Sequence, residues 1–187
     1  MRGRLQPRPM PISAAPQTVT PLRRFVAAPE RILEFIGLGE GETALEIGPG
    51  IGYYSVEAKR RLGSSGRLIC LDIQRDMLEE LRQRLSAASV EVDYVNASAE
   101  HLPFRDGVAH HAFLITVLGE IPNRAAALTE VGRVLRPDGH LSVSEQMPDP
   151  DFIGKGTLRL ELKAAAFVEE KTSGWLWYTS KWRRPAA

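Results

Sequence analysis

The sequence is poor in the features that mark secreted and membrane-spanning proteins. Its 187 residues include one cysteine, Cys70, so no disulfide can form within the chain. The thiol falls in the apolar run RLICLDI, where we expect it to be buried and inert. No apolar run approaches the roughly 20 residues of a membrane span, and the N-terminus has no apolar signal-peptide core. We therefore expect a cytoplasmic protein.

Neither a strong positive charge nor a metal-binding pattern is present. Lys and Arg (24 residues) nearly balance Asp and Glu (23), so the chain has no broad field for nucleic acid phosphates. The four histidines are scattered, and no pair has metal-ligand spacing with a third partner. We predict no nucleic acid partner and no metal.

The composition changes along the chain and divides it in two. Residues 1–20 are rich in proline and arginine, and we expect a flexible tail there. Residues 21–187 suit a single domain with a substantial core, because 43% of the chain is hydrophobic. Within that domain, we expect the stretch that starts at TPLRRF to fold over the rest as a lid.

Apolar periodicity predicts alternating strands and helices. Their order implies right-handed crossovers and an α/β fold with a doubly wound, mostly parallel sheet. We expect RPDG (136–139) to end a helix before the fifth strand, and Ser173-Gly174 to turn a C-terminal antiparallel hairpin that brings the sheet to seven strands. The predicted strands are 43–47, 67–73, 90–95, one within 108–118, and 140–145. The predicted helices include 29–36, one ending near 62, 75–85, 123–135 and 157–166.

The aromatic tail WLWYTSKW has two interpretations. As a strand it sends Trp175 and Trp177 to one face and Leu176, Tyr178 and Trp182 to the other, which favours packing on both faces of the sheet. The minority interpretation is a peripheral membrane contact, which the amphipathic aromatic side chains and the basic end of the tail support.

The stretch ALEIGPGIGYYS (44–55) follows a predicted strand and carries three alternate glycines. Such a loop lets backbone N–H groups approach a ligand. The third glycine is too early for the dinucleotide fingerprint G-x-G-x-x-G, and no G-K-[ST] follows, which excludes a P-loop. Glu46, directly before the loop, suits a ligand with an amino group. Asp72 ends the next strand, where a carboxylate can accept hydrogen bonds from ribose hydroxyls.

Four motifs in this order resemble one family. E-I-G-P-G-I-G, Asp72, ASAEHLPF (97–104) and LTEVGRVLRPDGHLSV (128–143) resemble class I S-adenosylmethionine-dependent methyltransferases of the type-11 group, similar to the ubiquinone and menaquinone C-methyltransferases. The resemblance covers about residues 21–185. It implies a Rossmann-like methyltransferase fold, S-adenosylmethionine as cofactor, and methyl transfer as the activity.

The resemblance also implies roles for particular residues. Glu46, Gly48, Pro49 and Gly50 would hold the methionine part of the cofactor, and Asp72 its ribose. Ser98 stands where the family commonly has an acid, so recognition of the base there would rest on backbone groups and Glu100. Asp72 as a plain helix cap, and Glu100 as a solvated acid, are the structural alternatives. The remaining expected cofactor contacts are Ile73, Met77, Ala99 and Thr116.

No catalytic residue stands out, and an in-line methyl transfer needs a base only if the acceptor must lose a proton. Glu120 and Tyr53 are the candidates, beside Tyr54, Thr116 and Gly119. We expect a small-molecule or lipid-like acceptor and a monomer or homodimer; a non-catalytic cofactor-binding module is the alternative. The expected acceptor pocket consists of Val117, Leu118, Ile121, the N-terminal segment and the 147–158 loop.

Overall fold

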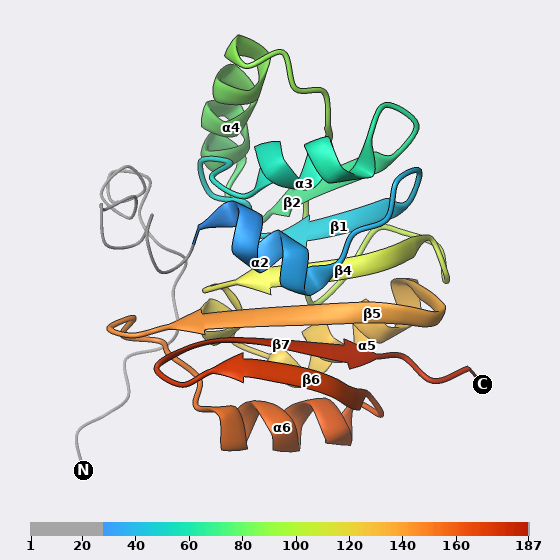
Figure 1. Cartoon of the computed structure of the whole chain (residues 1–187), viewed down its shortest axis with the longest axis vertical. Helices are drawn as coiled ribbons and strands as arrows, with labels where there is room; N and C mark the ends of the chain where they lie inside the picture. Colours follow the sequence, from blue (N-terminus) through green and yellow to red (C-terminus); the bar gives the residue numbers. More distant parts are fainter. Residues whose placement is uncertain (1–27, 187) are drawn as a thin grey trace.

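A computed structural model describes residues 28–186, and they form one seven-stranded sheet (Figure 1). The strand order is β3-β2-β1-β4-β5-β7-β6; β1 to β5 pair in parallel, and β7 pairs antiparallel with both β5 and β6. The predicted doubly wound fold with its antiparallel hairpin is therefore confirmed. The strands are β1 (Thr43–Ile47), β2 (Arg67–Asp72), β3 (Asp93–Asn96), β4 (Ala109–Ile115), β5 (Leu135–Gln146), β6 (Val168–Gly174) and β7 (Trp177–Arg183).

Helices cover both faces of the sheet and bury two apolar clusters. One cluster joins α2, α3 and α4 to the first face, and the other joins α5 and α6 to the second. Cys70 lies inside the first cluster, buried as expected. The helices are α2 (Pro29–Ile36), α3 (Ser55–Leu62), α4 (Arg75–Ala87), the 3₁₀ turn η2 (Leu118–Glu120), α5 (Arg124–Val134) and α6 (Lys155–Ala164).

Two predicted boundaries were wrong. β5 begins at Leu135, directly after α5, so residues 136–139 lie within the strand instead of separating it from the helix. An irregularity in the β4–β5 pairing and a left-handed φ of 60° at Asp138 accommodate them. The hairpin turn also falls later than Ser173-Gly174, because Gly174 still pairs with Tyr178.

The later turn changes which side chains of the aromatic tail are buried. Trp175 and Leu176 form the turn itself and stay 76% and 51% exposed, so the prediction that they pack on the sheet was wrong. Tyr178 and Trp182 are fully buried on one face of β7, as the alternation indicated. Core packing therefore accounts for only part of this aromatic segment.

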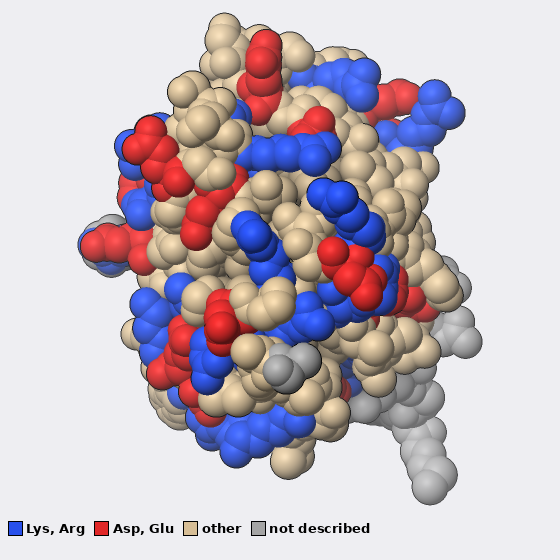
Figure 2. Space-filling view, turned by 90° about the vertical axis from the view of Figure 1, so that its right-hand side faces the viewer, with Lys and Arg blue, Asp and Glu red and all other residues tan. Residues whose placement is uncertain are grey.

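Charged side chains of both signs share the face at the amino ends of the parallel strands. Figure 2 shows acidic and basic groups interleaved there. Some form ion pairs, such as Arg67 with Asp93 (2.5 Å) and Arg183 with Asp138 (2.8 Å).

Among residues 28–186, no helix is both long and apolar enough to cross a bilayer. The predicted tail and lid lie outside the described residues.

Candidate functional site

A cavity of about 410 Å³ opens at the carboxyl ends of the parallel strands. Its volume lies within the usual range for small-molecule sites. Parallel α/β sheets bind ligands at this edge, since the loops after the strands converge there. Every residue expected to contact the cofactor lines this one cavity, and so do Tyr53 and Glu120. The expected cofactor contacts are Glu46, Gly48, Pro49, Gly50, Asp72, Ile73, Met77, Ser98, Ala99, Glu100 and Thr116.

The three positions of the first loop require glycine for different structural reasons. Gly48, Gly50 and Gly52 all have left-handed φ values, which side chains rarely adopt. A Cβ at Gly48 would lie 2.5 Å from the side chain of Val117, and one at Gly52 would lie 2.6 Å from Leu81. A Cβ at Gly50 would meet no protein atom within 4 Å. The backbone at Gly50 therefore faces open cavity, where a ligand can approach it closely.

Glu46 is a buried acid beneath the loop. Its carboxylate accepts a hydrogen bond from Ser55 Oγ (2.7 Å), and Cys70 Sγ lies 3.7 Å away. Burial raises the pKa of Glu46 from 4.5 to about 7, although both hydrogen bonds oppose the rise. This carboxyl can therefore hold or release a proton near neutral pH. Ser55, the first residue of α3, was missed at the sequence level.

Asp72 lies at the end of β2, and its carboxylate both braces the next turn and lines the cavity. Oδ1 accepts a hydrogen bond from the N–H of Gln74 (2.9 Å), the N-cap residue directly before α4. Burial raises the pKa of Asp72 despite the backbone hydrogen bonds. Beside it, Ile73 is 57% exposed, whereas Met77 is fully buried. Ile73 thus offers an apolar surface that a ligand could cover.

The loop after β3 carries Ser98, Ala99 and Glu100. Ser98 Oγ accepts from the Glu100 N–H (3.2 Å), which closes a short turn. Glu100 Oε1 accepts from the N–H of Asn123 (3.0 Å), the N-cap residue of α5. Glu100 is therefore a structural brace as well as a cavity residue, and the solvated alternative does not describe it.

Thr116, directly after β4, adopts a strained backbone conformation within the cavity wall. Its φ of 56° is unusual for a β-branched residue. Its N–H donates to the carbonyl of Ser144 (2.8 Å), and its hydroxyl donates to the carbonyl of Ile115 (2.7 Å). Strain of this kind persists where surrounding contacts hold it, and it concentrates at functional sites.

The acceptor side of the cavity is partly as predicted. Val117 and Ile121 line it, but Leu118 is fully buried in the core and Gly119 packs against the backbone of Asp151, so neither reaches the cavity. Of the 147–158 loop, Asp149 lines the wall. Tyr53 and Tyr54 meet edge to face with ring centroids 5.0 Å apart, and both line the cavity.

Glu145, near the end of β5, is a second buried acid that sequence reasoning missed. It is 1% exposed; Oε2 accepts a long hydrogen bond from the Ile153 N–H (3.4 Å), and Oε1 has no hydrogen bond in the described part of the chain. Burial raises its pKa to about 8. Glu145 does not line the cavity. Its position in an apolar strand gave no signal that distinguishes it from an outward-facing acid.

The histidines of β4 lie away from the cavity. His110 Nδ1 accepts from the Thr43 N–H (3.0 Å), and His111 contacts Glu42 and stacks on His140. Within residues 28–186, no three His, Cys, Asp or Glu side chains are grouped so as to hold a metal ion.

Comparisons with known proteins agree with this geometry. The family described as "Methyltransferase domain" matches residues 45–143, from β1 to β5. A crystal structure of an S-adenosylmethionine-dependent methyltransferase from Aquifex aeolicus superposes with a TM-score of 0.86 at 19% identity, over 93% of this chain and 98% of that one. The [4+2]-cyclase SpnF superposes with a TM-score of 0.76 at 17% identity, over 86% of this chain and 81% of that one.

Curated relatives match over part of their length. The ubiquinone/menaquinone biosynthesis C-methyltransferases UbiE of Haemophilus ducreyi and of Enterobacter sp. are each 34% identical over 111 residues, which is 58% of this chain. The match spans 43% and 44% of those proteins, less than half of their length. The family match, which extends over more than half of the chain, and the fold together lead to one conclusion: the chain belongs to the class I S-adenosylmethionine-dependent methyltransferases, in the family of the methyltransferase domain.

Proposed function

We propose that the protein transfers a methyl group from S-adenosylmethionine to a small-molecule or lipid-like acceptor, and that the cavity at the carboxyl ends of β1, β2 and β4 is the site of transfer. The observation that carries the proposal is that one cavity joins the glycine loop, Asp72, the Ser98-Ala99-Glu100 turn and the end of β4. These segments are far apart in sequence, and each supplies a different kind of contact.

The residues fit the cofactor part by part. Backbone groups around Gly48, Pro49 and Gly50 would receive the methionine end, because the open space at Gly50 admits a ligand against the main chain. Glu46 would attract the ammonium group, which would in turn favour the ionised form of this buried acid.

The nucleoside end would lie across the next two loops. Asp72 would accept hydrogen bonds from the ribose hydroxyls, and Ile73 and Met77 would pack on the adenine. The turn at Ser98, Ala99 and Glu100 would contact the edge of the base through its backbone; Thr116 would close the cavity at the end of β4.

When bound, S-adenosylmethionine supplies a methyl group already activated by positive sulfur. The protein's task is then to align the acceptor and exclude water, which in well-oriented systems lowers a barrier by about 7 to 11 kcal/mol. Tyr53 would position the acceptor beside the glycine loop. Glu120 would take a proton from the acceptor if its reacting atom must lose one, a contribution of roughly two to four decades in rate.

The acceptor side of the cavity supports a partly apolar molecule, although the acids Glu120 and Asp149 also line the cavity. Val117, Ile121 and Pro122 line that side of the cavity. The relatives named as ubiquinone and menaquinone biosynthesis methyltransferases support a small-molecule acceptor, over the part of their length that the chain matches.

A second candidate is a module that keeps the cofactor site but does not transfer methyl groups. A protein of the same fold that is named a [4+2]-cyclase favours keeping this alternative, since fold alone does not fix the reaction. Both candidates share the cofactor residues, so cofactor binding does not separate them.

Transfer of label separates them. The protein is incubated with methyl-labelled S-adenosylmethionine and an extract of metabolites and lipids, with Gly50→Val as the control that fills the open space of the cavity. Label in a small molecule, dependent on Gly50, supports methyl transfer. Label found only on protein or nucleic acid contradicts the small-molecule acceptor, and no transfer at all favours the non-catalytic module.

A further inference from the structure

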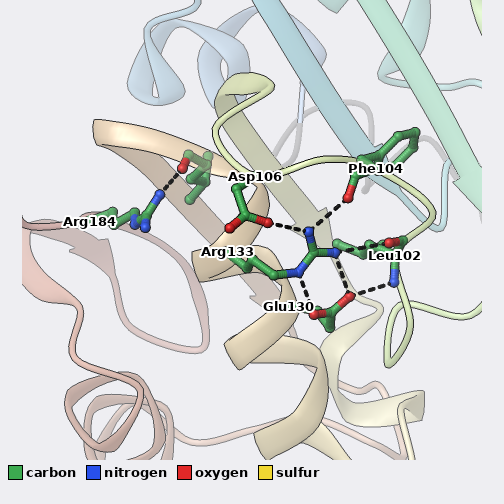
Figure 3. Close-up of polar contacts among 7 residues, drawn as sticks. Leu102, Phe104, Asp106, Glu130, Arg133 and Arg184 are labelled. Carbon is green, nitrogen blue, oxygen red and sulfur yellow. Dashed lines mark hydrogen bonds and ion pairs between the residues drawn. The ribbon is translucent and has the colours of Figure 1, made fainter. Parts of the chain in front are cut away.

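Arg133 on α5 makes five hydrogen bonds, one for each N–H of its guanidinium group (Figure 3). Nε and Nη2 donate to the two carboxylate oxygens of Glu130 (2.7 and 2.8 Å). Nη1 donates to Asp106 (2.7 Å) and to the backbone carbonyl of Phe104 (2.7 Å), and Nη2 also donates to the carbonyl of Leu102 (3.0 Å). Two of the five bonds therefore hold main-chain atoms of an irregular loop.

Glu130 completes the clamp from the same helix. Its Oε2 accepts a hydrogen bond from the Leu102 N–H (2.9 Å), and the Gly107 N–H donates to the carbonyl of Arg133 (3.1 Å). The Arg133 guanidinium lowers the pKa of Glu130 to about 2, so the pair stays ionised at all ordinary pH values. The backbone from residue 102 to 107 is thus bound to α5 at four points.

The clamped segment continues without a break into the cavity wall. Residues 98–100 line the cavity, and they precede the clamped Leu102 by only two positions. On the other side, the Ala97 N–H donates to the carbonyl of Asp72 (3.2 Å), and Asn96 Nδ2 donates to the same carbonyl (2.9 Å). Residues 98–100 of the cavity wall are therefore held on one side by the end of β2 and on the other by the contacts of α5 with residues 102–107.

We infer that Arg133, which does not line the cavity, is a positioning residue for cofactor binding: it holds the backbone at 98–100 in the arrangement that receives the adenine end. The inference rests on the proposed function, which assigns the adenine end to this turn. A loop without regular hydrogen bonding loses conformational entropy when a ligand orders it, and a loop ordered beforehand does not. Arg133, in the last turn of α5, would then affect the affinity for the cofactor as well as the fold.

The test compares Arg133→Met with a matched control, Arg159→Met. Arg159 makes a similar two-pronged pair with Glu169 (2.6 and 2.8 Å) on α6 and β6, and neither residue lines the cavity. Calorimetry measures the dissociation constants of S-adenosylhomocysteine and of adenosine, and hydrogen exchange follows the amides of residues 98–104. We expect Arg133→Met to weaken both ligands by about tenfold or more, with faster exchange confined to that loop. Arg159→Met should stay within about twofold of the wild type, because exposed ion pairs contribute little.

Arg133→Lys should recover part of the affinity, since lysine keeps the charge but not the planar fork. If Arg133→Met does not fold, Glu130→Gln tests the same clamp with a side chain of equal size. Wild-type affinity in a folded clamp variant would overturn the inference, as would an equal loss in Arg159→Met or faster exchange across the whole sheet. If the wild-type protein binds neither ligand, the result contradicts the proposed function and, with it, the inference that rests on that function.

Discussion

Replacement of Glu46 by glutamine should stabilise the protein without cofactor at alkaline pH and weaken its binding of S-adenosylmethionine. Folding raises the pKa of Glu46 from 4.5 to about 7, mainly because the carboxyl is fully buried. The folded state therefore binds this proton more tightly than the unfolded chain does. Stability is lost as the pH rises from about 4.5 through 7, and the loss is complete above 7. At about 1.4 kcal/mol for each tenfold change in proton affinity, ionised Glu46 costs roughly 3 kcal/mol.

Urea unfolding at several pH values measures this effect. The Glu46→Gln variant keeps an oxygen that can accept from Ser55 Oγ, so its free energy of unfolding should match the wild type near pH 4 and exceed it by up to roughly 3 kcal/mol at pH 8.5. Glu57→Gln is a control of opposite sign, because Arg60 and Arg61 lower the pKa of Glu57. A constant difference between wild type and Glu46→Gln from pH 4 to 8.5 would refute the reasoning.

Three further predictions concern the cavity and the core. Asp72→Ala should weaken binding of S-adenosylhomocysteine by about 1 to 3 kcal/mol in calorimetry, the usual effect of stranding hydrogen-bond partners; unchanged affinity would remove the ribose assignment. Gly50→Val should lose cofactor binding, because its side chain would occupy open cavity, and it should lose some stability, because a β-branched residue is strained at a φ of 55°. Gly48→Val should melt far lower still, because its Cβ also meets Val117 at 2.5 Å; equal melting temperatures would contradict this contrast. Trp182→Ala should cost about 3 to 5 kcal/mol in urea unfolding, and the exposed Trp175→Ala within about 0.5 kcal/mol; similar losses would contradict the burial pattern.

The strands and helices could be predicted because they depend on local sequence, and most residues around the cavity could be predicted from the family resemblance. Apolar runs such as RLICLDI are continuous in strands that are buried on both faces, and β2 has that pattern. The glycine loop follows β1 and Asp72 ends the neighbouring parallel strand β2, so their shared edge follows from topology alone.

Features that depend on contacts between distant segments were not predictable. The hairpin turn moved to Trp175 and Leu176 because Gly174 pairs with Tyr178, and this register is set across two strands. Ser55 beneath Glu46 and the clamp of Arg133 on residues 102–106 join elements whose spacing in sequence carries no periodic signal. Glu145 was missed for the same reason, because its burial and its contact with the Ile153 N–H depend on tertiary packing.

A crystal structure of the protein with S-adenosylhomocysteine tests the central claim most directly. The account predicts the ligand in the cavity at the carboxyl ends of β1, β2 and β4, with the ribose hydroxyls on Asp72 and the amino acid end against Gly48 and Gly50 beside Glu46. A ligand bound elsewhere, or bound in this cavity with its ribose away from Asp72, would contradict it.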